Sequence, residues 1–333
     1  MKSSLRLMTR QLPRVNVVKL PHASLKPSPS PSNGSSAKRT PTTAIPIPLW
    51  LAGFAFFGAV SFVGTKYYIL LSRPIPSFDP RTINLVEVYN TTAKDFDDKM
   101  EREEYWWGIL NLRKRLARMA QGDVLESAVG TGRNSEFFDG KKVKSLVLVD
   151  ESEGMLDICK EKWKVVSEGT HKWNDKVAFW VGNLAEDGVD QKVSPPDVDR
   201  QADAKHGKFD TVIQTMGLCS TNEPDKLLRN LGKLVKEDGQ ILLLEHGKGY
   251  YDWINKYLDV QAPDHAQRHG CWWNRDIGAI VEQSGLEILD MKRYTLGTTW
   301  WFVLKRPANF AEPVETSNEE MVPKAKSWWE VWR

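Results

Sequence analysis

The stretch Val124–Asn134, with the sequence VLESAVGTGRN, decides the fold of this 333-residue chain. An apolar run leads into a turn that contains Gly130 and Gly132. A second apolar run, 145–149, ends on Asp150. Glycines let the backbone approach a ligand closely, and an acid at the end of the next strand can accept hydrogen bonds from both hydroxyls of a ribose. The stretch therefore predicts a nucleotide-type site at the ends of two strands.

The spacing of the glycines differs from the dinucleotide fingerprint G-x-G-x-x-G. The pattern Glu126-x-Ala128-x-Gly130-x-Gly132 resembles instead the first motif of class I S-adenosylmethionine-dependent methyltransferases, E/D-x-G-x-G-x-G, with Ala128 at the first glycine position. The resemblance implies a SAM-binding enzyme, with S-adenosylmethionine (SAM) as its cofactor.

Strand-like and helix-like segments alternate from residue 123 onward, which predicts an α/β fold with a doubly wound, mostly parallel sheet. The last two strands are expected to form an antiparallel edge hairpin around Leu296 and Gly297. The resemblance implies a Rossmann-like, seven-stranded sheet in the class I methyltransferase order. The strands are expected at 123–127, 145–149, 177–181, 209–214, 240–245, 286–294 and 299–305.

Helices are predicted between these strands, with Pro224 in a first turn and Gly285 as a C-terminal cap. A longer helical stretch, 98–120, carries several charges that are expected to face solvent. The polar segment Glu186–Lys208 is expected to be an irregular insertion. The helices between strands are expected at 133–138, 152–166, 224–236, 250–260 and 275–284.

Residues 1–45 hold eight basic residues and no acidic residue, whereas the whole chain has a net charge of +3. The remaining residues are therefore net acidic, which makes a nucleic-acid partner an unfavoured expectation. Residues 1–23 resemble a mitochondrial presequence, the alternative being a basic tail, and 24–45 are rich in Pro and Ser, as in a linker.

The run Ile47–Thr65 contains no charge and is ~28 Å long as a helix, close to the thickness of a bilayer core. A single transmembrane helix is therefore predicted over 46–71, followed by a linker at 72–84. The methyltransferase domain is expected over 85–305. A polar tail, 306–333, ends in a tryptophan cluster with the spacing of a small interfacial anchor.

The resemblance assigns cofactor contacts to residues at the ends of the strands. The start of the helix near Asn134 is expected to face the methionine carboxylate, and Asp150 the ribose. Met155 and Asn183 are expected beside the adenine, and Gln214 beneath the sulfonium. The cofactor-binding set is therefore Glu126, Ala128, Gly130, Gly132, Asn134, Asp150, Met155, Asn183 and Gln214.

The later part of the chain narrows the resemblance from class I methyltransferases in general to one group of them. Residues 244–277, which include Trp253, Asp259, His265 and the run GCWWNRDI, are similar to the fungal mitochondrial inner-membrane methyltransferase group associated with oxidase-assembly suppression. More distant similarity extends to membrane-associated thiol methyltransferases and to ubiquinone and menaquinone biosynthesis methyltransferases.

His246 follows the fifth predicted strand, at the sheet edge where open α/β proteins bind ligands. It is the candidate general base, needed only if the acceptor must lose a proton. The candidate acceptor pocket consists of Met216, Trp272, Trp273, Asn274 and Arg275; the alternative for the Trp pair is core packing, and for Asn274 helix capping.

A metal site is the alternative to this assignment. His246, together with His265, His269 and Cys271 in H-x3-H-x-C spacing, does not form a recognised four-ligand pattern, and no metal is expected. Three cysteines are also too few for a disulfide framework.

Two functions follow from this pattern. The first is a SAM-dependent methyltransferase of the mitochondrial inner membrane, which methylates a small-molecule, lipid or thiol acceptor. The second is a degenerate methyltransferase that acts as an assembly or stability factor for respiratory-chain proteins. Lys38 and Arg39, before the predicted span, favour a domain in the intermembrane space.

Overall fold

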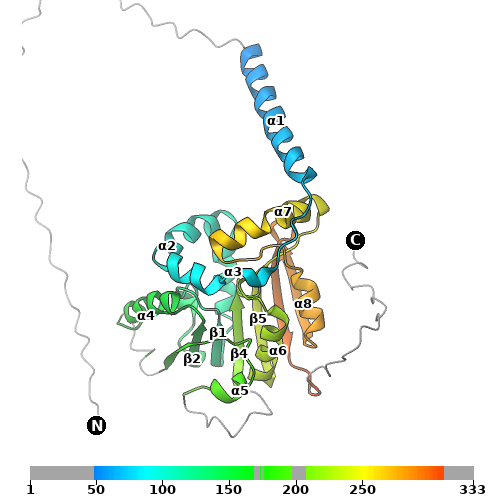
Figure 1. Cartoon of the computed structure of the whole chain (residues 1–333). Helices are drawn as coiled ribbons and strands as arrows, with labels where there is room; N and C mark the ends of the chain where they lie inside the picture. Colours follow the sequence, from blue (N-terminus) through cyan, green and yellow to red (C-terminus); the bar gives the residue numbers. More distant parts are fainter. Residues whose placement is uncertain (1–48, 169–172, 174–175, 197–207, 311–333) are drawn as a thin grey trace, which may run out of the picture. The chain divides into compact units, whose positions relative to one another are not determined.

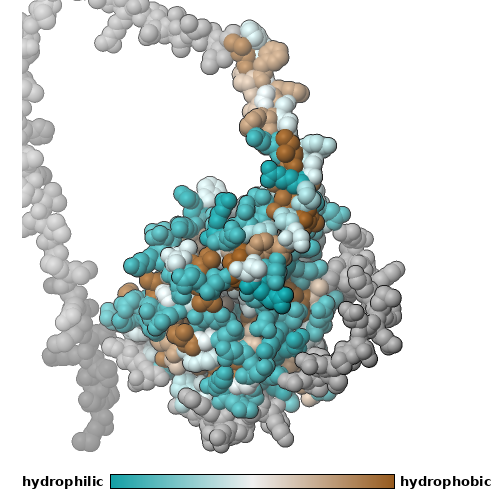
Figure 2. Space-filling view, viewed as in Figure 1, coloured by the Kyte–Doolittle hydropathy of each residue, from teal (hydrophilic) through white to brown (hydrophobic). Residues whose placement is uncertain are grey.

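The computed structural model describes residues 49–168, 173, 176–196 and 208–310. The predicted presequence, its linker and the terminal tryptophan cluster lie outside these residues. Helix α1, Leu49–Ser72, contains the one described segment, Trp50–Ser72, that is long and apolar enough to cross a membrane by length and composition. Large apolar side chains such as Phe54 and Phe57 are exposed along it, and Figure 2 shows hydrophobic residues over much of α1.

The described strands form one seven-stranded sheet in the order β3-β2-β1-β4-β5-β7-β6. Strands β1 to β5 pair in parallel, and β7 pairs antiparallel with both β5 and β6. This confirms the predicted class I order and the edge hairpin. The strand bounds are β1 Gly122–Ser127, β2 Val143–Asp150, β3 Val177–Val181, β4 Phe209–Thr215, β5 Val235–His246, β6 Glu287–Tyr294 and β7 Thr299–Lys305.

Helices cover both faces of the sheet. One face packs against α3, Ile109–Ala117, and α4, Glu153–Glu168, through side chains such as Leu116 and Leu156, which are fully buried. The other face packs against α6, Pro224–Leu234, and α8, Ile277–Gln283. The central strands are therefore apolar on both faces, as in other doubly wound parallel sheets.

The helical stretch predicted at 98–120 is two helices. Helix α2 covers Leu85–Trp106, and α3 begins after Gly108, whose φ of 70° cannot continue a right-handed helix. Helix α7, Asp252–His269, extends nine residues beyond the predicted 250–260 and places His265 and His269 on a helix. Figure 1 shows α2, α3 and α7 gathered at one end of the sheet.

Several helix ends lie at the proline, glycine and capping residues that favour them. Pro224 starts α6 as predicted, and Gly285, at φ 76°, follows the end of α8. Asp276 caps α8 by accepting a hydrogen bond from the Ala279 N–H. The segment predicted as an irregular insertion contains a short helix, α5, at Val189–Lys192; residues 197–207 lie outside the described part.

Candidate cofactor and acceptor site

A cavity of about 940 Å³ lies at the carboxyl edge of the parallel strands. Ser127, Asp150, Thr215 and His246 close β1, β2, β4 and β5, and all four line it. Residues of α2 and α7 form the opposite wall. The cavity is therefore in the place where open α/β folds bind their ligands, and its size is at the upper end of small-molecule sites, about 300–1,000 Å³.

The glycine loop, Ala128–Gly132, lies at this cavity, and its residues from Ala128 to Thr131 line it. Gly132 has a φ of 76°, and a Cβ there would approach Ser135 Oγ to 2.7 Å and Cys159 Sγ to 2.8 Å. Gly130 has a φ of 57°, but a Cβ there would meet no atom within 4 Å. Gly132 is thus required by packing, whereas Gly130 keeps space free for a ligand.

Ala128, the residue at the first glycine position of the motif, has a φ of 49° and lines the cavity. Non-glycine residues in this left-handed region are strained by ~1–2 kcal/mol. The backbone thus retains the conformation that the missing glycine would favour, and the methyl group adds strain to the loop.

Asp150 lies beside the loop. Its Oδ2 accepts a hydrogen bond from the Gly130 N–H at 2.7 Å, and its Oδ1 accepts one from the Ser152 N–H at 2.9 Å. Burial raises the pKa of Asp150, although these two N–H groups lower it in part. Met155, buried in the first turn of α4, also lines the cavity. Both residues therefore lie on the wall of one cavity, and their contacts with ribose and adenine stay predictions.

Five predicted cofactor residues do not line the cavity: Glu126, Gly132, Asn134, Asn183 and Gln214. Glu126 Oε1 accepts a hydrogen bond from Asn134 Nδ2 at 2.8 Å, and both residues are buried. Asn183 Oδ1 accepts one from the Ala185 N–H at 2.6 Å, which closes a turn. Gln214 is fully buried, and both its polar side-chain atoms lack a partner in the described structure.

Burial raises the pKa of Glu126 to about 7, and the hydrogen bond from Asn134 and the charge of Arg113 only partly oppose this. Its Oε2 has no hydrogen-bond partner among the described residues. Glu126 is thus a buried support of the loop.

The prediction of a helix at 133–138 is wrong. Only a three-residue 3-10 turn, Ser135–Phe137, follows the loop. Asn134 turns its side chain inward to Glu126 and Thr215, and β2 begins soon afterward, at Val143. A helix N-terminus is therefore absent from this position, and it cannot supply the expected binding site for a carboxylate.

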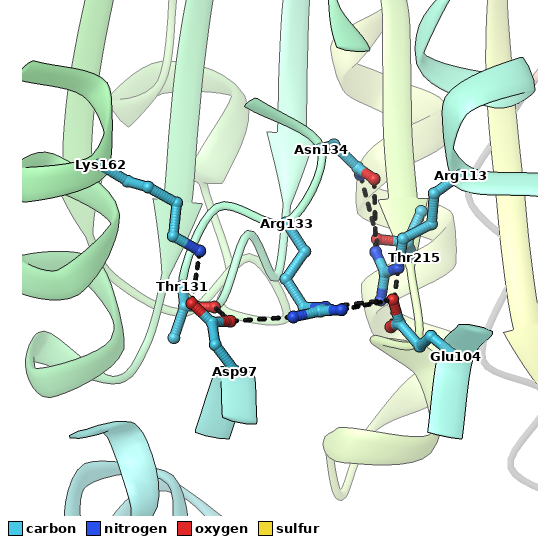
Figure 3. A network of polar contacts seen from close by, with 8 residues as sticks. All are labelled: Asp97, Glu104, Arg113, Thr131, Arg133, Asn134, Lys162 and Thr215. Carbon is cyan, nitrogen blue, oxygen red and sulfur yellow. Dashed lines mark hydrogen bonds and ion pairs between the residues drawn. The ribbon is translucent and has the colours of Figure 1, made fainter. Parts of the chain in front are cut away.

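Buried and half-buried charges occupy the neighbouring region instead (Figure 3). Glu104 of α2 accepts hydrogen bonds at Oε1 from Arg113 Nε, at 2.9 Å, and at Oε2 from Arg133 Nη2, at 2.8 Å. Asp97 Oδ1 accepts from Arg133 Nη1, at 3.1 Å, and Asp97 Oδ2 from Lys162 Nζ, at 2.6 Å. The loop is therefore held to α2 and α4 by ion pairs.

This network corrects the expectation that the charges of 98–120 face solvent. Glu104 is 8% exposed and Arg113 is 6% exposed. Burial raises the pKa of Glu104, but the two guanidinium groups outweigh it and keep the net pKa below the ordinary value. Arg113 and Arg133 line the cavity and bring positive charge to the region where the helix was expected. Their sequence spacing gave no signal of this pairing.

The structure places two of the five predicted acceptor-pocket residues on the cavity wall. Met216, with a φ of 57°, and Trp273 line the cavity, whereas Trp272, Asn274 and Arg275 do not. Trp272 packs in a small core beside Ala262 and Ala266. Asn274 Nδ2 donates to Asp259 Oδ1, and Arg275 donates to the carbonyl of Thr221. These contacts hold the loop after α7 in place. The side chains of these three residues therefore bind other parts of the chain and do not face the cavity, where contact with an acceptor was predicted.

His246 lies on the cavity wall with two thiols beside its ring. Its Nε2 is 3.1 Å from Cys219 Sγ and 2.6 Å from Cys271 Sγ. Burial lowers the pKa of His246, but Cys219 and Glu245 raise it, so that the net pKa lies above the ordinary value. The role of His246 as a general base stays a prediction. Cys219, which the sequence did not single out, follows the fourth strand at the ligand-binding edge.

The arrangement fits SAM, the cofactor that the first motif implies. The space beside Gly130 is free, Asp150 offers a carboxylate suited to ribose hydroxyls, and Met155 offers an apolar surface suited to adenine. Arg113 offers a guanidinium suited to the methionine carboxylate. The three chemical parts of the cofactor therefore have matching groups around one cavity.

Comparisons with known proteins agree with this geometry. Over 219 residues, 66% of this chain, the sequence is 42% identical to "Methyltransferase OMS1, mitochondrial" of Saccharomyces cerevisiae. This confirms the resemblance to the fungal group. The chain matches 45% of the length of that yeast protein.

More distant relatives share the methyltransferase description. The ubiquinone/menaquinone biosynthesis C-methyltransferase UbiE of Photorhabdus laumondii is 26% identical over 55% of this chain and 67% of its own length. A solved O-methyltransferase family protein from Burkholderia thailandensis is 17% identical, with a TM-score of 0.48 over 65% of this chain and 60% of that one.

The family assignment rests on a match to the family described as "Methyltransferase domain". The match covers residues 102–290, more than half of the chain, from α2 into β6. It includes the glycine loop, Asp150 and His246. The chain therefore belongs to the methyltransferase domain family.

Proposed function

We propose that this protein is a SAM-dependent methyltransferase of the mitochondrial inner membrane that methylates a small-molecule, lipid or thiol acceptor. One observation carries the proposal: Gly130 faces open space in the cavity while its N–H is held by Asp150. This pairing keeps a close-approach loop and a ribose-binding acid side by side.

When bound, SAM supplies an electrophilic methyl carbon on its sulfonium. Asp150 would accept from the ribose hydroxyls, because each carboxylate oxygen has a second acceptor position besides its backbone hydrogen bond. Met155 would pack against the adenine, and Arg113 would pair with the methionine carboxylate. These residues orient the methyl group. Positioning of this kind lowers a transfer barrier by up to ~7–11 kcal/mol.

The rest of the cavity suits an apolar acceptor. Its wall from α7 onward includes Trp253, Tyr257, Leu258 and Trp273, and Tyr89 of α2 lies on the same cavity. Aromatic and aliphatic side chains exclude water and hold apolar groups by burial. An acceptor with a lipid-like or otherwise apolar body fits this lining better than a highly charged one.

The cellular location is proposed from three features together. The yeast relative is named mitochondrial. Residues 1–23 have the composition of a presequence, and Trp50–Ser72 is apolar enough to span a bilayer. We place the domain in the intermembrane space. Protease added to mitoplasts tests this orientation: the domain should be digested while matrix proteins survive, and a protected domain would overturn it.

Calorimetry of the full chain in detergent tests the cofactor. We expect saturable SAM binding that weakens at least ~10-fold in Asp150→Ala, since a lost ribose contact is worth more than ~1.4 kcal/mol. Asp157→Ala, an exposed acid of α4, is the matched control and should bind normally. Absence of binding at millimolar SAM in a folded protein would refute the enzyme assignment.

The strained Ala128 favours a second candidate, a degenerate methyltransferase that assists assembly or stability of respiratory-chain proteins. Complementation separates the two. Full rescue of a deletion strain by Asp150→Ala would favour the assembly role, and failure to rescue by a stably expressed variant would favour catalysis. An untargeted metabolite comparison of deletion and wild-type mitochondria then identifies the acceptor.

A further inference from the structure

Three potential metal ligands from three separate segments meet on the cavity wall. Cys219 comes from the turn after β4, His246 from the end of β5, and Cys271 from the loop after α7. Their ligand atoms, two Sγ and one ring nitrogen, all lie within 4.8 Å of one another. Both cysteines are buried, and all three residues line the cavity.

We propose that Cys219, His246 and Cys271 bind a Zn²⁺ ion, with its fourth coordination position facing the cavity. Two thiolates and one imidazole form a donor set that zinc favours, and three protein ligands with an open position are typical of catalytic zinc. Among the described residues, no further His, Cys, Asp or Glu belongs to the group. The fourth position is therefore left for a molecule in the cavity.

The neighbouring contacts hold these ligands in place. Glu245 accepts hydrogen bonds from the N–H groups of Gly217, at 3.0 Å, and Leu218, at 3.1 Å, which fixes the turn just before Cys219. The backbone N–H of Trp272 donates a hydrogen bond to the carbonyl of Cys219 at 2.8 Å. This bond holds the Cys271 segment against the same turn. Supporting hydrogen bonds of this kind orient ligands in metal sites.

The distances and charge also suit a metal. Tetrahedral zinc separates neighbouring N and S ligands by ~3.5 Å, so that loading requires the two N···S distances of 3.1 and 2.6 Å to widen by less than ~1 Å. Side-chain rotation provides such a change. Two thiolates neutralise Zn²⁺, which makes the site electrically balanced in an apolar wall. The Nε2 atom of His246 can form a hydrogen bond with only one of the two thiols at a time, so a hydrogen bond does not account for both close contacts.

This inference deepens the proposed function and rests on it for its chemical consequence. The sulfur or oxygen of an acceptor in the cavity would take the open position and release its proton to solvent. Its lone pair would form the bond to the methyl carbon as the bond from that carbon to the sulfonium breaks. The site then favours thiol or hydroxyl acceptors, because zinc lowers the pKa of such a group.

The metal content of the full chain, purified in detergent without chelator, tests the site. We expect about one zinc per wild-type chain, and less than about a tenth of that in Cys219→Ser, Cys271→Ser and His246→Gln, because a three-ligand site rarely survives loss of a ligand. Cys159→Ser is the matched control, since Cys159 is also buried but packs beneath the glycine loop. This variant should keep its zinc.

A second measurement avoids any dependence on variant folding. Co²⁺ replacing zinc in the wild-type chain should give thiolate-to-cobalt charge-transfer bands and the strong visible bands of tetrahedral coordination. A folded chain that takes up neither ion would overturn the proposal, as would a Cys219–Cys271 disulfide found by mass spectrometry in the freshly purified protein.

SAM calorimetry separates this inference from the proposed function. Zinc in a wild-type chain that fails to bind SAM would support the metal site and refute the enzyme assignment. SAM binding by a chain that takes up no zinc would refute the metal site alone. Zinc-free Cys219→Ser that still binds SAM but no longer transfers methyl would support both.

Discussion

Arg133, which follows the glycine loop, and Glu104 of α2 form a largely buried ion pair, with Arg133 Nη2 2.8 Å from Glu104 Oε2. The same carboxylate accepts a hydrogen bond from Arg113 at 2.9 Å. Glu104 thus contacts two guanidinium groups next to the cavity, and Asp97 is a second acidic partner of Arg133. Glu104 is the structural link between the loop, α2 and α3.

Replacing Glu104 with Ala should destabilise the protein by ~3–5 kcal/mol, because it removes the carboxylate that two largely buried guanidinium groups, of Arg113 and Arg133, share. Urea unfolding of the detergent-solubilised chain, followed by tryptophan fluorescence, measures this. Glu101→Ala on the exposed side of α2 should change the unfolding free energy by less than ~0.5 kcal/mol. Equal effects of the two changes would show that the network contributes little.

Ala128→Gly should stabilise the protein by about 1 kcal/mol, since glycine adopts a φ of 49° without steric strain. The same change at Ala117, in the buried core of α3, should do the opposite and cost at least ~1 kcal/mol. Denaturation midpoints of the two variants give the comparison. A destabilised Ala128→Gly protein would mean that the methyl group contributes packing that exceeds its strain.

Gly130→Ala should reduce SAM affinity by at least ~10-fold, because the new methyl occupies cavity space that the cofactor needs. Gly108→Ala is a matched control: its φ of 70° is equally unfavourable, and its Cβ would also meet no atom within 4 Å, but Gly108 does not line the cavity. Both variants should lose similar stability. Calorimetry with SAM should distinguish them, and an unchanged affinity in Gly130→Ala would argue against cofactor binding at this loop.

The buried carboxyl of Glu126 predicts a pH dependence of stability. Its folded pKa is raised to about 7, from an ordinary value of 4.5, by burial. Between these values the folded state keeps a proton that the unfolded state releases. This contribution is therefore greatest below about pH 4.5, falls as the pH rises, and levels off above about pH 7, a total of ~3 kcal/mol.

Unfolding free energies of wild type and Glu126→Gln at pH 5 and pH 8 isolate this contribution. The variant should gain stability relative to wild type as the pH rises, because glutamine cannot ionise. Glu136→Gln, an exposed residue of the same region, should follow wild type at both pH values. A constant difference between Glu126→Gln and wild type would show that Glu126 does not titrate in this range.

The sheet could be predicted because its strands are apolar runs that end at polar or turn-forming residues. Leu148 and Leu242 are buried on a sheet covered on both faces, so their segments are continuously apolar. The position of Asp150 and Gly130 at the cavity could be predicted because the motif marks the ends of two neighbouring parallel strands. The helix after Gly132 could not be excluded from the sequence, since Asn134 is compatible with a helix start until its side chain is seen to bind Glu126.

Long-range pairing set the limit of prediction at the site. Glu104 and Arg113 have the composition of a solvated helix face, and only the break at Gly108 turns both inward. The local spacing of His265 and Cys271 gave no sign of their real neighbours. The His265 ring stacks on Trp273, with ring centroids 3.8 Å apart, whereas Cys271 Sγ lies beside His246. Cys219 reaches His246 through the parallel pairing of β4 and β5, which spacing along the chain does not reveal.

The family match begins at residue 102, in the middle of α2, but the first half of that helix belongs to the same structural unit. Asp97 accepts hydrogen bonds from Thr131, Arg133 and Lys162, and Asn90 Oδ1 accepts from Ser152 Oγ and the Gly154 N–H. A fragment that started at residue 102 would leave five donors without their acceptors. A fragment of this protein that is meant to fold alone should therefore contain all of α2, which begins at Leu85, 17 residues before the start of the family match.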